Sequence, residues 1–418
     1  MSAAEDVTLA PAAAARPAPI RREDRIIHLD ILRGFAVLGI LAVNAATFAW
    51  PPALDFDPTL ARPWVENAAN VTGEWVVDVF FQDKFRSLFS MLFGVSIFLI
   101  GGERHDEAKA PVLHRRLMWL GLFGLIHGAA IWMGDILLHY AYCGLIAMLG
   151  RSWSARRLIL IGGGLNLVFA LISALGLWAQ AAFAGQGDSG QNPFAATPED
   201  IQALIAAYQS GFPAAQIENF KSWLLLETLS LFLAPITIAL MWLGLGLFKA
   251  GFLVGRAPAW VYLILVALAA GNLAFFAPNA WLDANAEAGT YPSGGMAGIG
   301  ASFAWVITLG YASALILMTK FGLGIVSRRF APVGQMAFTN YLSQSLIMAS
   351  LFYLPWGPMW FGDERFAPGG MWWVVGAVWL LQLVWSPLWL SRFEMGPLEW
   401  LWRGLTYGRL PPLRRRRA

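Results

Sequence analysis

Long stretches of apolar residues, separated by short polar or charged segments, follow one another along this whole chain. Each is close to the roughly 20 residues that an α-helix needs to cross the hydrocarbon of a bilayer. Of the 418 residues, 58% are hydrophobic and only 13% are charged, whereas soluble domains average about 25% charged residues. Because lipid can cover an apolar surface, we predict an all-α fold, a polytopic transmembrane helical bundle.

The apolar stretches divide into about ten expected spans. They are Leu29–Trp50, Trp75–Gly101, Leu117–Met133, Ile136–Gly150, Leu158–Ala181, Trp223–Phe248, Trp260–Phe276, Ala297–Met318, Val333–Tyr353 and Met371–Leu390. The third and fourth are short and nearly continuous, so they fit either a tight helical hairpin or one broken helix. The longest loop contains one helix-like stretch, Pro198–Gln209.

Basic residues fall mainly in alternate loops, which is the positive-inside pattern of membrane proteins. We therefore expect both termini in the cytoplasm. The expected organisation is a disordered tail at 1–24, one transmembrane helical domain at 25–408 and a basic tail at 409–418. Since the net charge of +3 is spread over many loops, we expect no nucleic-acid partner.

Several familiar motifs are absent from the sequence. Cys143 is the single cysteine, so no intramolecular disulfide can form. The H-E-x-x-H zinc motif, the G-x-S-x-G elbow and the Walker A loop do not occur. We therefore expect neither a metal cofactor nor nucleotide-driven transport.

Charged residues inside apolar spans are costly, so each one is a candidate functional residue. In the first span, Asp30 and Arg33 are three residues apart and can pair on one helix face. The pair fits either a structural ion pair or a site where Arg33 holds an anionic group such as a phosphate. The neighbouring Gly34 allows another helix to approach closely.

The second span begins with a cluster of charges that includes Asp78, Lys84 and Arg86. If Trp75 marked the interface, Lys84 would lie about 13 Å deep at 1.5 Å per residue. Either these side chains line a polar cavity, or the residues up to Gln82 form an interfacial segment and the span starts later.

His127 lies inside the third span, between Gly124 and Gly128, which allow close helix packing. A buried histidine is commonly a hydrogen-bonded core residue, but histidine is also the commonest general base. Asp135 follows at the outer end of the expected hairpin. It could orient His127, or it could be solvated.

Five segments resemble a family of bacterial membrane proteins. They are LDILRGFAVLGILAVN (29–44), KFRSLFSMLFG (84–94), RRLMWLGLFGLIHGAAIWMGDIL (115–137), VGQMAFTNYLSQS (333–345) and GPLEWLWR (396–403). On these segments the chain is identified as a member of the YeiB-like family, which is domain of unknown function 418. The resemblance implies a multi-pass protein of the bacterial cytoplasmic (inner) membrane.

The first two spans also resemble transmembrane acyltransferases of the heparan-alpha-glucosaminide N-acetyltransferase family. The matching residues are Asp30, Arg33, Gly34, Asn44 and Asp78, followed by F-G-V-S-I-F. This resemblance implies transfer from cytoplasmic acyl-CoA to an acceptor on the far side, such as a sugar or a lipid-linked glycan. Those enzymes have a histidine between the two spans, whereas Pro51–Glu74 has none, so His127 would take its role.

If this chemistry is shared, the candidate residues have expected roles. The expected cofactor-binding residues are Asp30, Arg33, Arg115 and Arg116, whose arginines would hold the CoA phosphates. The expected catalytic residues are His127, Asp135, Asp78, Lys84 and Arg86. His127 would be the general base, and Lys84 or Arg86 would stabilise the developing oxyanion charge.

Two other functions fit the same residues. A transporter or flippase for an anionic or lipid-linked solute would use Asp78, Lys84 and Arg86 to line its path, although we find none of the internal repeats common in transporters. A non-catalytic membrane partner protein would need Arg33 and His127 only for stability. Membrane lipid is the expected partner in each case, and the sequence leaves the oligomeric state open.

Overall fold

The computed structural model describes residues 26–57, 60–183 and 196–415, which are almost entirely helical. The first half contains α1 (Ile27–Ala49), α2 (Ala53–Phe56), α3 (Ala68–Phe80), α4 (Lys84–Gly101), α5 (Ala110–Ala130), α6 (Leu137–Ala147), η2 (Met148–Gly150), α7 (Ala155–Ala182) and α8 (Pro198–Gln209). The second half contains α9 (Phe212–Lys249), α10 (Ala259–Ala284), α11 (Met296–Ser302), α12 (Ala304–Lys320), α13 (Gly324–Ser327), α14 (Phe330–Gln335), α15 (Ala337–Phe352), η3 (Glu364–Phe366), α16 (Pro368–Arg392) and α17 (Pro397–Tyr407). The all-α prediction is confirmed.

Most expected spans coincide with helices, usually within a few residues. Six stretches of the described chain are long and apolar enough to cross a membrane, namely α1, α3 with α4, α7, α9, α10 and α16. A seventh is reached if α11 and α12, which meet at a bend of 53°, count as one span. The other expected spans coincide with α5, α6 and α14–α15, which do not meet the same test, so the total of ten stays a prediction. The chain is a multi-pass helical membrane protein.

Two ambiguities of the sequence are resolved. The third and fourth expected spans are separate helices, α5 and α6, which pack against each other as a hairpin. The second expected span is broken, because α3 ends at Phe80 and α4 begins at Lys84. Between them Asp83 adopts a positive φ of 61°, an uncommon conformation for a residue other than glycine.

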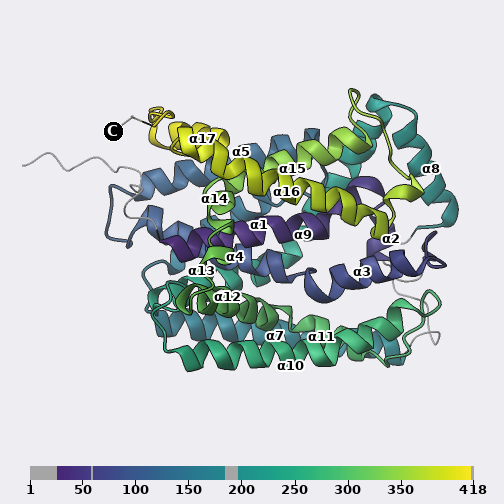
Figure 1. Cartoon of the computed structure of the whole chain (residues 1–418), viewed down its shortest axis with the longest axis horizontal. Helices are drawn as coiled ribbons and strands as arrows, with labels where there is room; N and C mark the ends of the chain where they lie inside the picture. The colour runs from purple at the N-terminus through teal and green to yellow at the C-terminus, as the bar shows by residue number, and fades with distance from the viewer. Residues whose placement is uncertain (1–25, 58–59, 184–195, 416–418) are drawn as a thin grey trace, which may run out of the picture.

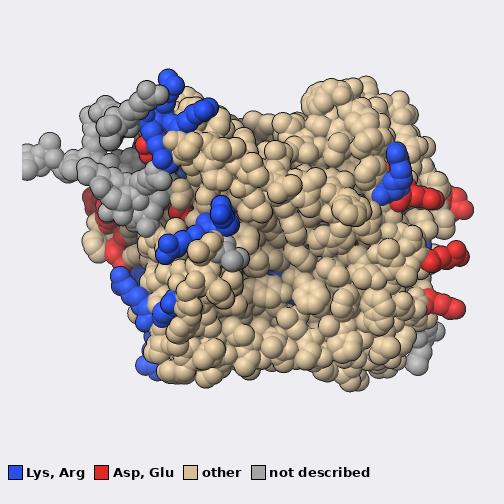
Figure 2. Space-filling model, in the orientation of Figure 1, with Lys and Arg blue, Asp and Glu red and all other residues tan. Residues whose placement is uncertain are grey.

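The long helices run in roughly the same direction, with α17 at one end and α2 and α8 near the other (Figure 1). Figure 2 shows Lys and Arg side chains concentrated at the end where α17 lies. A broad band of this face carries no charged side chain, and acidic side chains project from the opposite end. This distribution matches a molecule whose middle lies in lipid.

Helix α1 lies at the centre of the bundle and packs against α4, α14, α15 and α16. Its contact with α14 is a backbone contact, because a Cβ atom built on Gly34 would overlap the carbonyl oxygen of Phe330. The reverse also holds, since a Cβ atom on Gly334 would overlap the carbonyl oxygen of Asp30. The expectation that Gly34 permits close helix approach is confirmed.

Outside the long helices, α8 has the bounds that the sequence predicts, Pro198–Gln209. Thr197 and Asp200 form a capping box at its start, in which each side chain bonds the other residue's backbone N–H. Such a box satisfies two N–H groups that a helix start otherwise leaves unpaired.

Candidate functional site

Two cavities follow one another along α1. The first, here named the arginine cavity, has a volume of about 270 Å³ and contacts α1 between Leu29 and Ile40. The second, named the carboxylate cavity, has a volume of about 460 Å³ and contacts α1 between Ala42 and Thr47. The same order holds along α4, where the carboxylate cavity reaches Arg86 and the arginine cavity begins at Phe89. The cavities therefore lie in opposite halves of the bundle.

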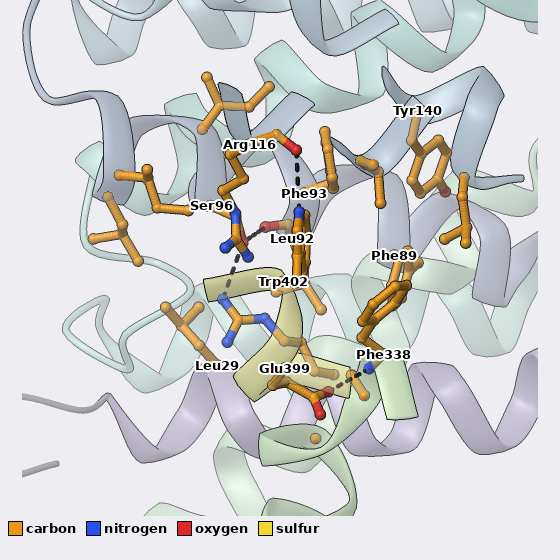
Figure 3. Close-up of a pocket in the computed structure, with 18 of the residues that line it drawn as sticks. Leu29, Phe89, Leu92, Phe93, Ser96, Arg116, Tyr140, Phe338, Glu399 and Trp402 are labelled. Carbon is orange, nitrogen blue, oxygen red and sulfur yellow. Dashed lines mark hydrogen bonds between the residues drawn. The ribbon is translucent and has the colours of Figure 1, made fainter. Parts of the chain in front are cut away.

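Three arginines, Arg33, Arg116 and Arg403, line the arginine cavity, from α1, α5 and α17. Arg33 pairs with Asp30 at 3.3 Å and donates a hydrogen bond to Ser96 Oγ at 3.2 Å. The guanidinium of Arg116 lies 3.5 Å from the ring centre of Trp402, and the indole N–H of Trp402 donates to the Arg116 carbonyl (Figure 3). These contacts hold the cationic groups on one wall.

The rest of the arginine cavity is mainly apolar. Leu29, Phe89, Leu92, Phe93 and Phe338 surround its interior (Figure 3). A cationic wall beside an apolar interior suits an amphiphile with an anionic head and an apolar tail.

Glu399, on the same wall, caps the start of α15. Its carboxylate accepts hydrogen bonds from the backbone N–H groups of Phe338 and Thr339, at 2.7 and 3.1 Å. Burial raises the pKa of this carboxyl above its usual range, while the hydrogen bonds from Thr339 oppose that rise. Glu399 thereby joins α17 to α15.

His127 and Asp135 form a buried pair at the turn between α5 and α6. The Nδ1 atom of His127 lies 2.8 Å from Oδ1 of Asp135, and their side chains are 1% and 0% exposed. The other oxygen of Asp135 accepts the backbone N–H of Leu138 at 2.8 Å. His127 Nε2 is buried and has no hydrogen-bond partner among the described residues. This is the arrangement of a general base whose second nitrogen is held by a carboxylate.

The pair lies at the boundary between the two cavities. Tyr341, which lines the arginine cavity, has its ring centre 5.4 Å from that of His127. On the other side Trp132, which lines the carboxylate cavity, lies 6.2 Å from it. Ile136, next to Asp135, lines both cavities. His127 itself lines neither cavity, but Tyr341 and Trp132, whose rings lie beside it, each line one.

The carboxylate cavity brings together Asp55, Glu74, Asp78 and Asp135, with the two cations Arg62 and Arg86. Arg62 pairs with Glu74 at 2.6 Å. The cavity suits a polar or cationic group. No group of three or more His, Cys, Asp or Glu side chains that could hold a metal ion occurs in the described parts of the chain.

Two more of the candidate site residues line neither cavity. Lys84 lines neither cavity; its amino group donates to the carbonyl of Asp78 at 2.7 Å and lies over the ring of Phe276. Lys84 follows the break at Asp83 and is buried in the packing, so the cavity linings give no support to its expected oxyanion role. Arg115 also lines neither cavity, because it points to the exposed face of α5. Asp78 and Arg86 do line a cavity, as predicted.

Three site residues were missed by sequence reasoning. Arg403 and Tyr341 reach the arginine cavity through the docking of α17 and α15, for which the sequence gives no signal. His139 lines the carboxylate cavity, and both of its ring nitrogens have hydrogen-bond partners, Tyr142 at 2.6 Å and Thr237 at 2.8 Å. Its place in an apolar stretch was the signal that could have identified it.

The comparisons with known proteins identify one family, whose members have no stated activity. The family described as "Protein of unknown function (DUF418)" matches residues 247–409. The chain is 31% identical over 414 residues to the "Uncharacterized protein YxaH" of Bacillus subtilis (strain 168), covering 93% of this chain and 96% of that protein. It is also 31% identical over 409 residues to the "Uncharacterized protein YeiB" of Escherichia coli (strain K12), covering 92% and 96%.

Proposed function

Since this chain belongs to the family of YeiB and YxaH, described as proteins of unknown function (DUF418), we propose that it is a membrane-embedded acyltransferase. It would take an acyl group from acyl-CoA and pass it to an acceptor at the opposite face of the membrane. One observation supports this above all: the buried His127–Asp135 pair lies between two cavities of different character, one cationic and apolar, the other polar and acidic.

The arginine cavity would hold the donor. Arg33, Arg116 and Arg403 supply positive charge that suits the phosphates of CoA. The apolar interior suits the acyl chain, and its lining includes Tyr341 and Ile136, which lie beside the His127–Asp135 pair. In the bacterial cytoplasmic membrane this cavity would face the cytoplasm, where acyl-CoA is made.

The carboxylate cavity would hold the acceptor. Its carboxylates and the aromatic face of Trp372 suit a hydroxyl-rich or amino-bearing group, such as a sugar or a lipid-linked glycan. His127 Nε2 would remove the proton from the attacking hydroxyl or amine. The C–S bond would then break, and the same proton would go to the departing CoA thiolate. Asp135 would hold the imidazole in the tautomer that leaves Nε2 free to accept.

A flippase for an anionic lipid-linked solute is the second candidate, because the two cavities lie in line through the bundle. A transporter would expose one central site to each side in turn. Such a mechanism does not require a buried histidine that is hydrogen-bonded to a carboxylate. We therefore place the acyltransferase first.

The test is acyl-CoA binding to detergent-purified protein by titration calorimetry, with acetyl-CoA and octanoyl-CoA as probes. We expect saturable binding that Arg33→Gln and Arg116→Gln each weaken by on the order of 10-fold or more, because hydrogen bonds to charged groups contribute about 1.5–3 kcal/mol. Arg115→Gln is the matched control, since it removes the adjacent, exposed arginine. Folded wild type that binds neither probe would contradict the proposal and move the flippase into first place.

A further inference from the structure

Tyr341 combines burial, a cavity position and a hydroxyl group that has no acceptor in the described parts of the chain. It lies on α15, its side chain is nearly enclosed at 4% exposure, and it lines the arginine cavity. Its hydroxyl has no hydrogen-bond partner that meets normal geometric limits among the described residues. The backbone N–H of Ile136 lies against it and can only donate, so the phenolic proton has no acceptor there.

Three other buried tyrosines have hydrogen-bond partners. Tyr353 donates to the carbonyl of Ile131 at 2.7 Å, and Tyr262 donates to the carbonyl of Phe252 at 2.7 Å. Tyr140, which shares the cavity with Tyr341, bonds Ser90 Oγ at 2.8 Å. A buried polar group without a partner is costly, and a phenylalanine at 341 would fill the same space without that cost. Packing alone therefore does not explain the hydroxyl group.

The neighbours of Tyr341 are the residues that the proposed reaction uses. Its ring packs 5.4 Å from that of His127. The cations expected to stabilise an oxyanion are elsewhere, because Lys84 bonds the carbonyl of Asp78 and Arg86 is held by Asp83 at 2.7 Å. Arg86 also lines the other cavity. At the His127 end of the arginine cavity, the Tyr341 hydroxyl can donate a hydrogen bond to a bound carbonyl, whereas the hydroxyl of Tyr140 is already bonded to Ser90.

We propose that Tyr341 is a catalytic residue that stabilises the oxyanion formed when the acceptor attacks the acyl thioester. The inference rests on the proposed acyltransferase function. Attack forms a bond from the acceptor oxygen or nitrogen to the carbonyl carbon, and the C=O electron pair moves onto oxygen, where the Tyr341 hydroxyl donates a hydrogen bond. His127 Nε2 takes the acceptor proton. Collapse restores C=O, breaks the C–S bond and returns that proton to the CoA sulfur.

The test compares Tyr341→Phe with wild type and with Tyr262→Phe, a control that lines neither cavity. Purified full-length protein is given acetyl-CoA or octanoyl-CoA with glucosamine as the probe acceptor. Release of CoA thiol gives the rate, and mass spectrometry detects the acylated sugar. We expect Tyr341→Phe to lower kcat on the order of 100-fold, the usual loss for one oxyanion donor.

The same variant should bind acyl-CoA within about twofold of wild type and melt at the same or a higher temperature. If Tyr341 had only a structural role, Tyr341→Phe would not lower kcat while leaving acyl-CoA binding and the melting temperature unchanged. Wild-type kcat in Tyr341→Phe would overturn the role of Tyr341 and leave the acyltransferase intact. No transfer by wild type with either thioester would overturn the acyltransferase itself, and the role of Tyr341 with it.

Discussion

At the scale of single residues, the pairing of His127 with Asp135 connects the fold to a chemical function. A carboxylate at Nδ1 keeps the proton on that nitrogen and leaves Nε2 able to accept one. We expect His127→Gln and Asp135→Asn each to reduce acyl transfer by on the order of 100-fold or more. Acyl-CoA binding should persist, because neither side chain lines the arginine cavity. The measurement is CoA release beside calorimetric binding.

Asp135→Asn is the more informative of these variants. Asparagine keeps an oxygen that can accept the Leu138 N–H, so the start of α6 should stay folded. Its amide group would donate to His127 Nδ1 and move the ring proton to Nε2, which removes the base. His114→Gln, at an exposed histidine of α5, the helix that carries His127, is the control. Full activity in Asp135→Asn would show that the pair is structural.

The sequence predicts a contact between two side chains well only when the two residues are close together along the chain. Asp30 and Arg33 are three residues apart on one helix, and the predicted pair is present. His127 and Asp135 are eight residues apart, which would be about 12 Å along a continuous helix. The turn between α5 and α6 brings them together, and sequence spacing does not define that turn. Arg403 and Tyr341 are still harder to predict, because the packing of distant helices places them.

At the scale of helices, the backbone contact between α1 and α14 fixes one wall of the arginine cavity, because Gly334 of α14 lines it. Gly34→Ala should reduce the free energy of unfolding by about 1–3 kcal/mol, the usual cost of overpacking. Gly164→Ala is the matched control, since a Cβ atom there has no neighbour within 4 Å. It should be neutral or stabilising by up to about 1 kcal/mol. Apparent melting temperatures in one detergent would measure both changes, and equal values would contradict this account.

Helix positions were largely predictable, because an apolar run and a capping signal are local features. The bounds of α8 agree with the sequence, and α1 and α7 differ from their expected spans by only a few residues. The breaks were not predictable. The second expected span divides at Asp83, which adopts a positive φ, and Lys84, directly after the break, lines neither cavity.

At the scale of the whole molecule, the charge distribution predicts which cavity opens to which side. The start of α1 and the helix α17 both line the arginine cavity, so they lie at one end of the bundle, the end where Lys and Arg concentrate (Figure 2). The positive-inside rule predicts that this end faces the cytoplasm. The carboxylate cavity, in the other half, would then open to the outside.

Cysteine labelling tests this orientation directly. The single native cysteine, Cys143, is fully buried, so Cys143→Ser gives a clean background. Gln335→Cys places a thiol in the arginine cavity and Thr47→Cys places one in the carboxylate cavity. We expect a membrane-impermeant maleimide to label position 47 in spheroplasts and position 335 in inverted vesicles.

Each other labelling pattern has a distinct meaning. If both positions were labelled from one side, the cavities would not open to opposite faces, and a reaction that joins a cytoplasmic donor to an external acceptor would lose its structural basis. A fully reversed pattern would keep two opposed cavities but place the arginines outside. Acyl-CoA could then not reach them, and an anionic lipid-linked solute would become the better candidate for the arginine cavity.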